Sequence, residues 1–119
     1  MRTVDGCLFC GIVAEAIPAT VVYQNDAVVA FRDIAPQAPT HVLVVPRDHI
    51  DHAGAVEESD AHTMAALITA AKKVADLEGI GGDDRGYRLI FNVGPDAQNS
   101  VPHLHLHVVG GRSLTWPPG

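Results

Sequence analysis

The sequence predicts an α+β domain in which an antiparallel β-sheet of about five strands packs against one long helix. Three observations support this fold class: short apolar segments of strand length, one long amphipathic segment between residues 59 and 79, and the order strands, helix, strands along the chain. With 119 residues, the chain is long enough for one domain with a single core. Residues 1–119 are therefore assigned to one domain, in which residues 110–119 form a C-terminal tail.

The first half of the chain predicts three strands. Apolar residues at 21–23 and 28–31 flank Asn25-Asp26, two residue types that tolerate the positive φ of a tight turn, so a β-hairpin is expected. A third strand at 41–45 is apolar at every position after its first residue and stops at Pro46. This pattern is typical of a central strand that is covered on both faces.

The second half predicts the helix and two further strands. The helix should begin near Ser59-Asp60, which supply an N-cap and a first-turn acid, and end at Gly79. One stripe of the helix is expected to face the core: Met64, Leu67, Ile68, Ala71 and Val74. A strand is expected at 88–92, and the loop 92–100 then leads into a last strand at 103–109.

Composition and charge narrow the possible partners. Apolar residues make up 47% of the chain and aromatic residues 5%, as in ordinary globular proteins. A net charge of −6 argues against binding to polymeric nucleic acid, although backbone N–H groups, hydroxyls and imidazoles can still hold the phosphate of a mononucleotide. The chain shows no apolar signal core and no segment of the ~20 apolar residues that span a bilayer. We therefore expect a cytoplasmic protein with no membrane partner.

Three histidines alternate with leucine near the end of the chain, at His103, His105 and His107. In a strand they would line one face roughly 6.6 Å apart, because each residue rises about 3.3 Å, while Leu104 and Leu106 would face the core. Imidazole titrates near neutral pH and can act as nucleophile, proton donor or metal ligand. The alternative is an exposed strand that happens to use histidine.

Two cysteines and two further polar residues are candidates for chemistry. Cys7 and Cys10 are too few for a zinc site, but His49 and His103 could complete a closed tetrahedral one. A redox pair lacks its βαβ context and a disulfide is unusual in the cytoplasm, whereas buried thiols stay an open alternative. Asp33 could accept hydrogen bonds from a vicinal diol or simply start a turn. His41 could fix the tautomer of another ring or be a core histidine.

The histidine strand carries a family resemblance. His103–Val109 matches the His-φ-His-φ-His-φ-φ signature of the histidine triad (HIT) superfamily. Four further segments, 31–41, 92–94, 100–103 and 110–119, resemble its Hint branch of histidine-triad nucleotide-binding proteins. The resemblance implies a HIT-like fold with an additional short N-terminal helix. It also implies a homodimer that hydrolyses purine nucleoside 5′-phosphoramidates.

The resemblance also implies a role for each matching residue. His105 would attack the α-phosphorus and be transiently nucleotidylated, with His107 and His103 beside the phosphate and His41 behind the rings. Water would then release the nucleoside monophosphate. The implied substrate-binding residues are Asp33 at the ribose hydroxyls, Asn92, Asn99 and Ser100 at the phosphate and leaving group, and Phe9, Ile12, Phe31 and Ile34 around the base. Trp116, on a tail stiffened by prolines, is expected to help complete the active site of the partner subunit.

Two departures from the Hint pattern bear on this reading. Residues 96–99 read Asp-Ala-Gln-Asn, where many Hint proteins have Gly-Gly-Gln. Cys7 and Cys10 resemble the zinc ligands of other bacterial triad proteins, which pair them with histidines matching His49 and His103. The implied zinc is structural, and no cofactor is expected for catalysis.

Other functions stay open on the sequence alone. They are a non-catalytic purine-nucleotide-binding module and a dinucleoside polyphosphate hydrolase. A metallohydrolase with zinc on the triad is less favoured, because no carboxylate or water-activating partner is apparent near the histidines in the sequence.

Overall fold

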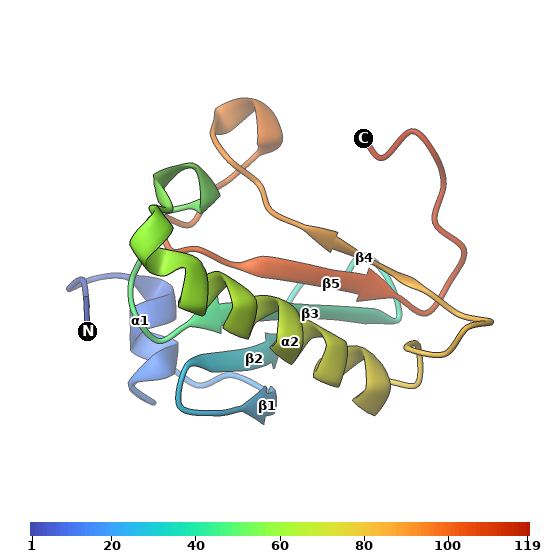
Figure 1. Ribbon diagram of the computed structural model, residues 1–119, viewed down its shortest axis with the longest axis horizontal. Coiled ribbons are helices and arrows are strands. Elements are labelled where there is room, and N and C mark those ends of the chain that lie inside the picture. The colour runs from blue at the N-terminus through green and yellow to red at the C-terminus, as the bar shows by residue number, and fades with distance from the viewer.

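The computed structural model describes residues 1–119 and contains one five-stranded sheet with two α-helices (Figure 1). The elements are α1 (Leu8–Val13), β1 (Val21–Gln24), β2 (Val28–Arg32), β3 (Thr40–Pro46), α2 (Ala61–Leu77), β4 (Tyr87–Ile90) and β5 (Leu106–Gly110). The strand order is β1-β2-β3-β5-β4, and every neighbouring pair is antiparallel. This architecture confirms the predicted α+β class, the single long helix and the short N-terminal helix.

The two faces of the sheet are covered by different helices, and β3 contributes side chains to both. Val42 and Val44 pack with α2 in one core cluster, whereas Leu43 and Val45 pack with Phe9 of α1 in the other. All seven residues of β3 are buried, as the unbroken apolar run predicts for a central strand. The groove described below opens on the α1 face.

The start of α2 differs in detail from the sequence prediction. A 3-10 turn, Glu58–Asp60, precedes the helix, and the Asp60 carboxylate accepts the Glu57 N–H at 3.0 Å and an Arg2 N–H at 2.8 Å. The carboxylate therefore caps the turn rather than the helix. The predicted core stripe is wrong at Ile68, which is 39% exposed, because Ala70 and Ala75 face the sheet instead.

The hairpin between β1 and β2 forms without the positive φ expected at Asn25-Asp26. The Asn25 side-chain oxygen accepts the N–H groups of Ala27 and Val28, at 2.9 and 3.0 Å. The Asn25 N–H also donates to the Val28 carbonyl at 3.0 Å. The turn spans three residues and is closed by the asparagine side chain, so the left-handed conformation is not needed.

The last two strands are shifted from their predicted ranges. The strand β4 covers 87–90 rather than 88–92, and β5 begins at Leu106 rather than His103. The chain turns at His103, whose N–H donates to the Val101 carbonyl, and Leu104 then donates to the carbonyl of Ile50 at 2.6 Å. The apolar back face is confirmed, because Leu104, Leu106 and Val108 lie in the core cluster under α2.

The C-terminal tail leaves the end of β5 and runs away from the sheet (Figure 1). Trp116 is 80% exposed, and its nearest cation is the Arg88 guanidinium, 5.7 Å from the ring centroid. None of the helices combines the length and the apolar character that a membrane span requires.

Candidate active site and metal centre

A groove of about 920 Å³ opens on the α1 face of the sheet. Phe9 and Ile12 of α1 form one apolar wall with Phe31 of β2, and Ile34 lies at the exposed rim. The polar part of the groove is formed by Asp33, Asn92, Ser100, His105 and His107. The structure thus brings together residues from four separate segments that the sequence singled out.

Strand register explains why two of the imidazoles meet. His41 pairs with Val109, and Leu43 pairs with His107, so the two histidines are diagonal neighbours on the same face of β3 and β5. His41 Nε2 lies 2.8 Å from His107 Nδ1. His41 is buried behind the groove rather than on its surface.

Backbone contacts fix the tautomers of this pair. The Gln37 N–H donates to His41 Nδ1 at 3.0 Å, so in the neutral ring the proton lies on Nε2 and is donated to His107 Nδ1. The proton of His107 then lies on Nε2, at the groove, where Asn92 Nδ2 is 3.4 Å away; the Asn92 amide accepts this proton only with its oxygen turned toward the ring. Burial, with His105 and His41 nearby, lowers the pKa of His107 to about 4. His107 is therefore a neutral hydrogen-bond donor at pH 7.

His105 has the opposite arrangement of nitrogen atoms. Its Nδ1–H donates to the His103 carbonyl at 2.7 Å, which leaves Nε2 with a free lone pair. The ring lines the groove and packs against the edge-on rings of Phe9 and His107, at centroid distances of 5.2 and 5.1 Å. A neutral imidazole with a free Nε2 at an open groove is a competent nucleophile.

Asp33 lies at the end of β2, on the rim of the same groove. One carboxylate oxygen accepts the Ala35 N–H at 2.8 Å, and the other lies 3.4 Å from His41 Nε2. The sequence suggested no carboxylate near the histidines, and this is wrong. A metal at Asp33, His41 and His107 is nevertheless disfavoured, because the proton shared at 2.8 Å by the two rings occupies the nitrogen atoms that would bind it.

Three predicted site residues lie outside this groove. His103 is fully buried and points away from it, so the expectation that His103 flanks the phosphate is wrong in this fold. Trp116 is far out on the tail and does not line the groove of its own subunit.

Asn99 is the third of these residues, and a neighbour takes its place at the groove. The Asn99 side-chain oxygen is buried without a partner, whereas Gln98 lines the groove with a left-handed φ of 60°. Gly94, at φ +80°, bends the same loop. The sequence predicts the loop, but it does not reveal the left-handed backbone conformation that puts Gln98, rather than Asn99, in the groove.

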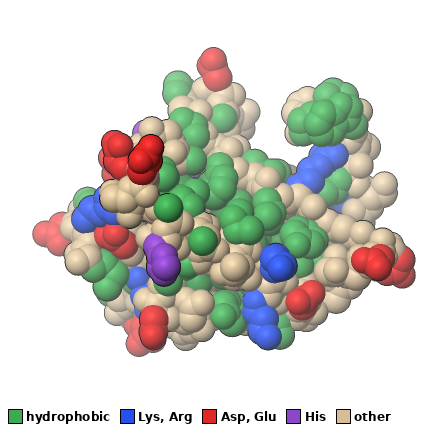
Figure 2. All heavy atoms as spheres, viewed as in Figure 1, with side chains coloured by type: hydrophobic (Ala, Val, Ile, Leu, Met, Phe, Trp, Pro, Cys, Tyr) green, Lys and Arg blue, Asp and Glu red, His purple; other side chains and the backbone are tan.

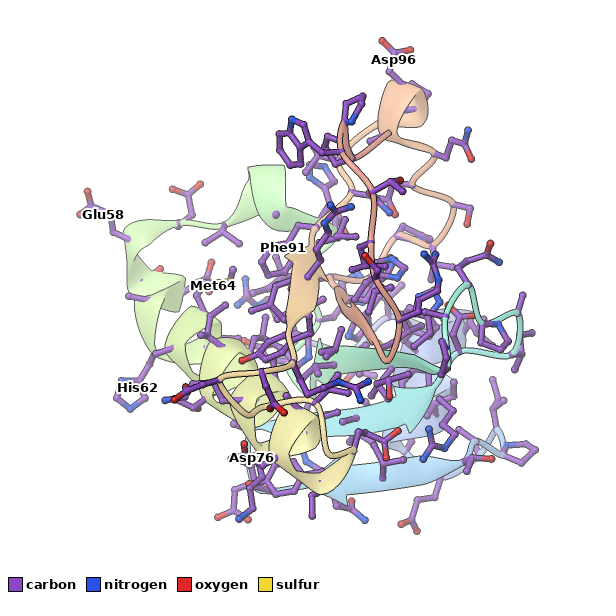
Figure 3. The ribbon with its side chains drawn as sticks, turned by 90° about the vertical axis from the view of Figure 1, so that its right-hand side faces the viewer. Glu58, His62, Met64, Asp76, Phe91 and Asp96 are labelled. Carbon is purple, nitrogen blue, oxygen red and sulfur yellow. The ribbon has the colours of Figure 1, made fainter.

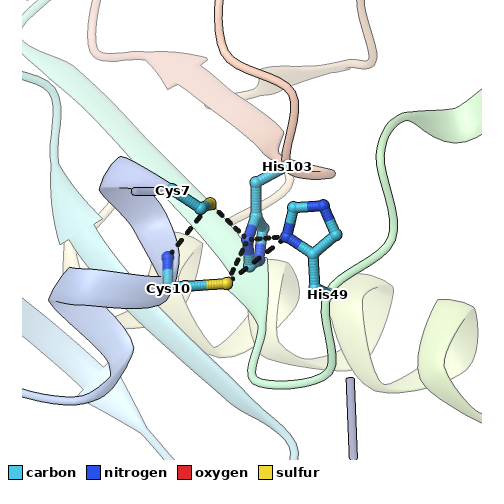
Figure 4. Close-up of side chains that lie close together, drawn as sticks. All are labelled: Cys7, Cys10, His49 and His103. Carbon is cyan, nitrogen blue, oxygen red and sulfur yellow. Dashed lines mark hydrogen bonds between the residues drawn. The ribbon is translucent and has the colours of Figure 1, made fainter. Parts of the chain in front are cut away.

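His103 instead joins Cys7, Cys10 and His49 in a compact cluster (Figure 4). His103 Nδ1 lies 3.3 Å from Cys7 Sγ and 3.5 Å from Cys10 Sγ, and His49 Nδ1 lies 3.3 Å from Cys10 Sγ. The four donor atoms all lie within 4.8 Å of one another. In tetrahedral zinc sites, Zn–N bonds of about 2.05 Å and Zn–S bonds of about 2.3 Å put neighbouring donors roughly 3.3–3.8 Å apart.

The positions of the ring protons in His49 and His103 leave both Nδ1 atoms available to bind a metal ion in this cluster. His49 donates its Nε2–H to Asp51 at 2.8 Å, and His103 donates its Nε2–H to the Pro46 carbonyl at 2.9 Å. Both Nδ1 atoms then carry lone pairs and face each other at 3.1 Å, with no proton between them. The donor set fits Zn²⁺, which Cys7, Cys10, His49 and His103 would hold as a closed, structural site.

The surroundings of the cluster are held by the N-terminal segment. The His49 N–H donates to the Arg2 carbonyl at 2.8 Å, and the Arg2 guanidinium binds Asp48 at 2.7 Å. These bonds lower the pKa of the Asp48 carboxyl. Burial raises the pKa of the Cys10 thiol, an effect that a bound cation would oppose.

The fold and the site together define a histidine triad protein. The chain belongs to the HIT domain family, whose model matches residues 14–114. The match begins after both cysteines, so the thiol half of the cluster lies outside the part of the chain that the model covers. The predicted family is confirmed.

Individual relatives cover nearly the whole chain. A "14 kDa zinc-binding protein" from Brassica juncea is 44% identical over 94% of this chain and 98% of that protein. The crystal structure of a HIT family hydrolase from Legionella pneumophila Philadelphia 1 is 48% identical, with a TM-score of 0.92 over 96% of this chain and 100% of that one. A histidine triad protein from Clostridium difficile is 37% identical, with a TM-score of 0.88 over 97% of each chain.

Proposed function

We propose that this chain hydrolyses purine nucleoside 5′-phosphoramidates through a nucleotidyl-His105 intermediate, as an enzyme of the Hint branch. The observation that carries the proposal is the hydrogen bond from His105 Nδ1 to the His103 carbonyl, 2.7 Å long, which leaves Nε2 free at the groove. The name of the Legionella relative, a HIT family hydrolase, supports a hydrolytic reaction.

The first step forms a bond between His105 Nε2 and the α-phosphorus and breaks the P–N bond of the substrate. The leaving nitrogen departs as an amine once it is protonated, and it faces the open side of the groove, where water can supply the proton. His107 donates its Nε2–H to a phosphoryl oxygen, and Asn92, which is 3.4 Å from His107, and Ser100 also line the groove and can bind the phosphate. In the second step water attacks the phosphorus, releases the nucleoside monophosphate and restores His105.

The remaining groove residues bind the nucleoside. Asp33 accepts hydrogen bonds from the ribose hydroxyls, because the residue lines the groove and its second oxygen makes only a 3.4 Å contact, with His41 Nε2, within the protein. The base lies between the apolar side chains of Phe9, Ile12 and Phe31, with Ile34 at the rim. A purine offers more flat surface to this slot than a pyrimidine does.

The protein is further proposed to be a homodimer. Hydrophobic side chains gather on the face that carries α2 (Figure 2). Ile68 of α2 is 39% exposed, and Leu89, which pairs with the core residue Val108 and so lies on the same face of the sheet, is 37% exposed. Figure 3 shows Met64 of α2 and Phe91, just after β4, on this face. Because β4 is an edge strand beside these side chains, a second copy of the chain fits as the occupant. Trp116 of each subunit would then reach the groove of its partner.

The proposed partners follow from the same features. The substrate is a small purine nucleotide, and the net charge of −6 disfavours polymeric nucleic acid. A site that uses two reduced thiols suits the cytoplasm. The other candidate functions are a binding module without turnover and a dinucleoside polyphosphate hydrolase.

One assay separates these functions. The wild-type protein and His105→Ala are given nucleoside phosphoramidates and dinucleoside polyphosphates, with and without a chelator. We expect fastest turnover of phosphoramidates, and a loss of at least ~10³ in kcat for His105→Ala with nucleoside monophosphate binding kept. A His105→Ala protein that keeps a tenth of the activity would falsify the nucleophile, and binding without turnover in the wild type would favour the binding module.

A further inference from the structure

We propose that the cysteine–histidine cluster positions the nucleophile, so that His103 and Phe9 are positioning residues for the reaction. This inference rests on the proposed role of His105. A single residue joins the two sites: the ring of His103 enters the cluster, 3.3 Å from Cys7 Sγ, and its carbonyl accepts the Nδ1–H of His105 at 2.7 Å. A displacement of the His103 backbone, when the ring leaves the cluster, therefore moves the carbonyl that sets the His105 tautomer.

The sheet does not hold the His103 carbonyl in place by itself. The ladder of β5 begins only at Leu106, and the chain turns at His103. The peptide plane that carries the His103 carbonyl is held by Leu104, whose N–H donates at 2.6 Å to the carbonyl of Ile50, the residue after His49. The His103 ring is held by the Pro46 carbonyl, which accepts its Nε2–H at 2.9 Å, and by the cluster. Because two Nδ1 lone pairs face each other at 3.1 Å, the rings of His103 and His49 are expected to separate when no cation holds them.

Phe9 forms a second connection between the cluster and His105. It lies between the two cysteines on α1, and its ring packs on His105 at 5.2 Å and on Phe31 at 5.4 Å. Of the six residues of α1, only Phe9 and Cys10 are buried. The helix is therefore held against the sheet at two points, the apolar packing of Phe9 and the contacts of Cys10 in the cluster, and loss of the second should loosen the wall that packs on the His105 ring.

This arrangement predicts a specific defect when the cluster is broken. His105 should populate the tautomer with its proton on Nε2, which cannot attack phosphorus, and its ring should rotate more freely. Asp33 and Phe31 lie on β2 and its end, outside the cluster, so the ribose contact and one side of the base slot should stay in place. The affinity for nucleoside monophosphate should therefore fall far less than kcat.

The test compares Cys7→Ala and His103→Cys with the zinc-loaded wild type. Histidine ¹⁵N NMR reports the His105 tautomer without turnover, and metal analysis and circular dichroism report loading and folding. Cys7→Ala should show mixed His105 tautomers and a kcat about 100-fold lower, the scale of a 1 Å misplacement, with monophosphate affinity within about 3-fold. His103→Cys keeps a fourth ligand and the carbonyl, and should restore the single tautomer and a kcat within about 10-fold of the wild type.

Val74→Ala is the matched control, because Val74 of α2 is buried against the opposite face of the sheet and belongs to neither the groove nor the cluster. It should destabilise the fold while the His105 tautomer and kcat stay unchanged. If Cys7→Ala does not fold, the second variant to measure is Phe9→Leu, which keeps all four metal ligands. Its kcat is expected to be about 5-fold lower than that of the wild type. A folded, metal-free Cys7→Ala with one His105 tautomer and normal kcat, or a Phe9→Leu with normal kcat, would overturn the proposal.

The two proposals fail in different ways. If His105→Ala keeps its activity, the nucleophile is wrong whatever the NMR shows. If His105→Ala is inactive but the His105 tautomer is independent of the metal, the hydrolase stands and the cluster has only a structural role.

Discussion

His103 and His105 are two residues apart, yet they belong to regions with opposite properties. His103 is fully buried among donor atoms that all lie within 4.8 Å of one another. His105 lines a groove of about 920 Å³ that can admit a nucleotide. In His103 the Nε2–H bonds outward and Nδ1 turns inward, whereas in His105 the Nδ1–H bonds to the backbone and Nε2 faces open space. The partner of one ring nitrogen decides the chemistry of the other.

The largest expected effect comes from disrupting the buried cluster around His103. Cys7→Ser should remove a soft ligand and lower the free energy of unfolding by at least about 3 kcal/mol, because buried donors lose their cation. Elemental analysis of protein purified without added metal should find about one zinc per chain in the wild type and much less in the variant. Negligible zinc in the wild type, with Cys7→Ser equally stable, would mean that the cysteines are ordinary buried thiols.

In the groove at His105, Asp33 should distinguish ribose from 2′-deoxyribose. A hydrogen bond to a carboxylate contributes roughly 1.5–3 kcal/mol, so ribonucleotides should be preferred over 2′-deoxyribonucleotides by about 10- to 150-fold. Asp33→Ala should erase this preference, as measured by kcat/KM for the matched pair. Asp26→Ala removes a negative charge from the exposed hairpin turn and should keep the preference. Equal discrimination in all three proteins would remove Asp33 from the ribose site.

His107, in the same groove, should make the free energy of unfolding depend on pH. Because burial lowers the pKa of His107 from 6.5 to about 4, its contribution to stability is complete above pH 6.5 and is lost as the pH falls toward 4. The size should be on the order of 2 kcal/mol. Denaturant titrations at several pH values should show this slope in the wild type and in the exposed-site control His62→Gln, but a flatter one in His107→Gln. Parallel curves for all three would show that the His107 proton affinity is not altered by folding.

The smallest effect is expected from the C-terminal tail, which touches neither the cluster nor the groove of its own subunit. Deleting 114–119 should leave the fold intact and change kcat/KM for substrates with different leaving amines by about 3- to 10-fold, because Trp116 would be lost from the partner's groove. Trp116→Ala should reproduce most of that change. Sedimentation that shows a monomer, or an unchanged ranking of leaving groups, would exclude the tail from the active site.

Much of the fold could be predicted because apolar patterning decides it. The continuous run in β3 and the alternation of Leu104, Leu106 and Val108 correctly indicated a doubly covered strand and a core face. Local choices were harder to predict. At Asn25 a side-chain hydrogen bond replaces the positive φ, and at Ile68 small alanines elsewhere on α2 allow closer packing against the sheet.

The candidate site was predictable as a set of residues but not as an arrangement. Alternation placed His103 on the same face as His105 and His107, but the turn at His103 directs its ring into the cluster. No periodicity encodes this turn, because it depends on contacts with two residues far away in the sequence, Pro46 at the end of β3 and Ile50 in the loop that follows. For the same reason Gln98, selected by a left-handed backbone, was missed.

The central claim is that His105 Nε2 becomes covalently bonded to phosphorus. Rapid acid or denaturant quenching of the wild-type protein during turnover of a nucleoside phosphoramidate, followed by peptide mass spectrometry, tests it directly. The account predicts a nucleoside monophosphate adduct on His105 that decays as product forms and is absent from His105→Ala. Steady turnover with no adduct at any time point, or with the adduct on His103 or His107, would contradict it.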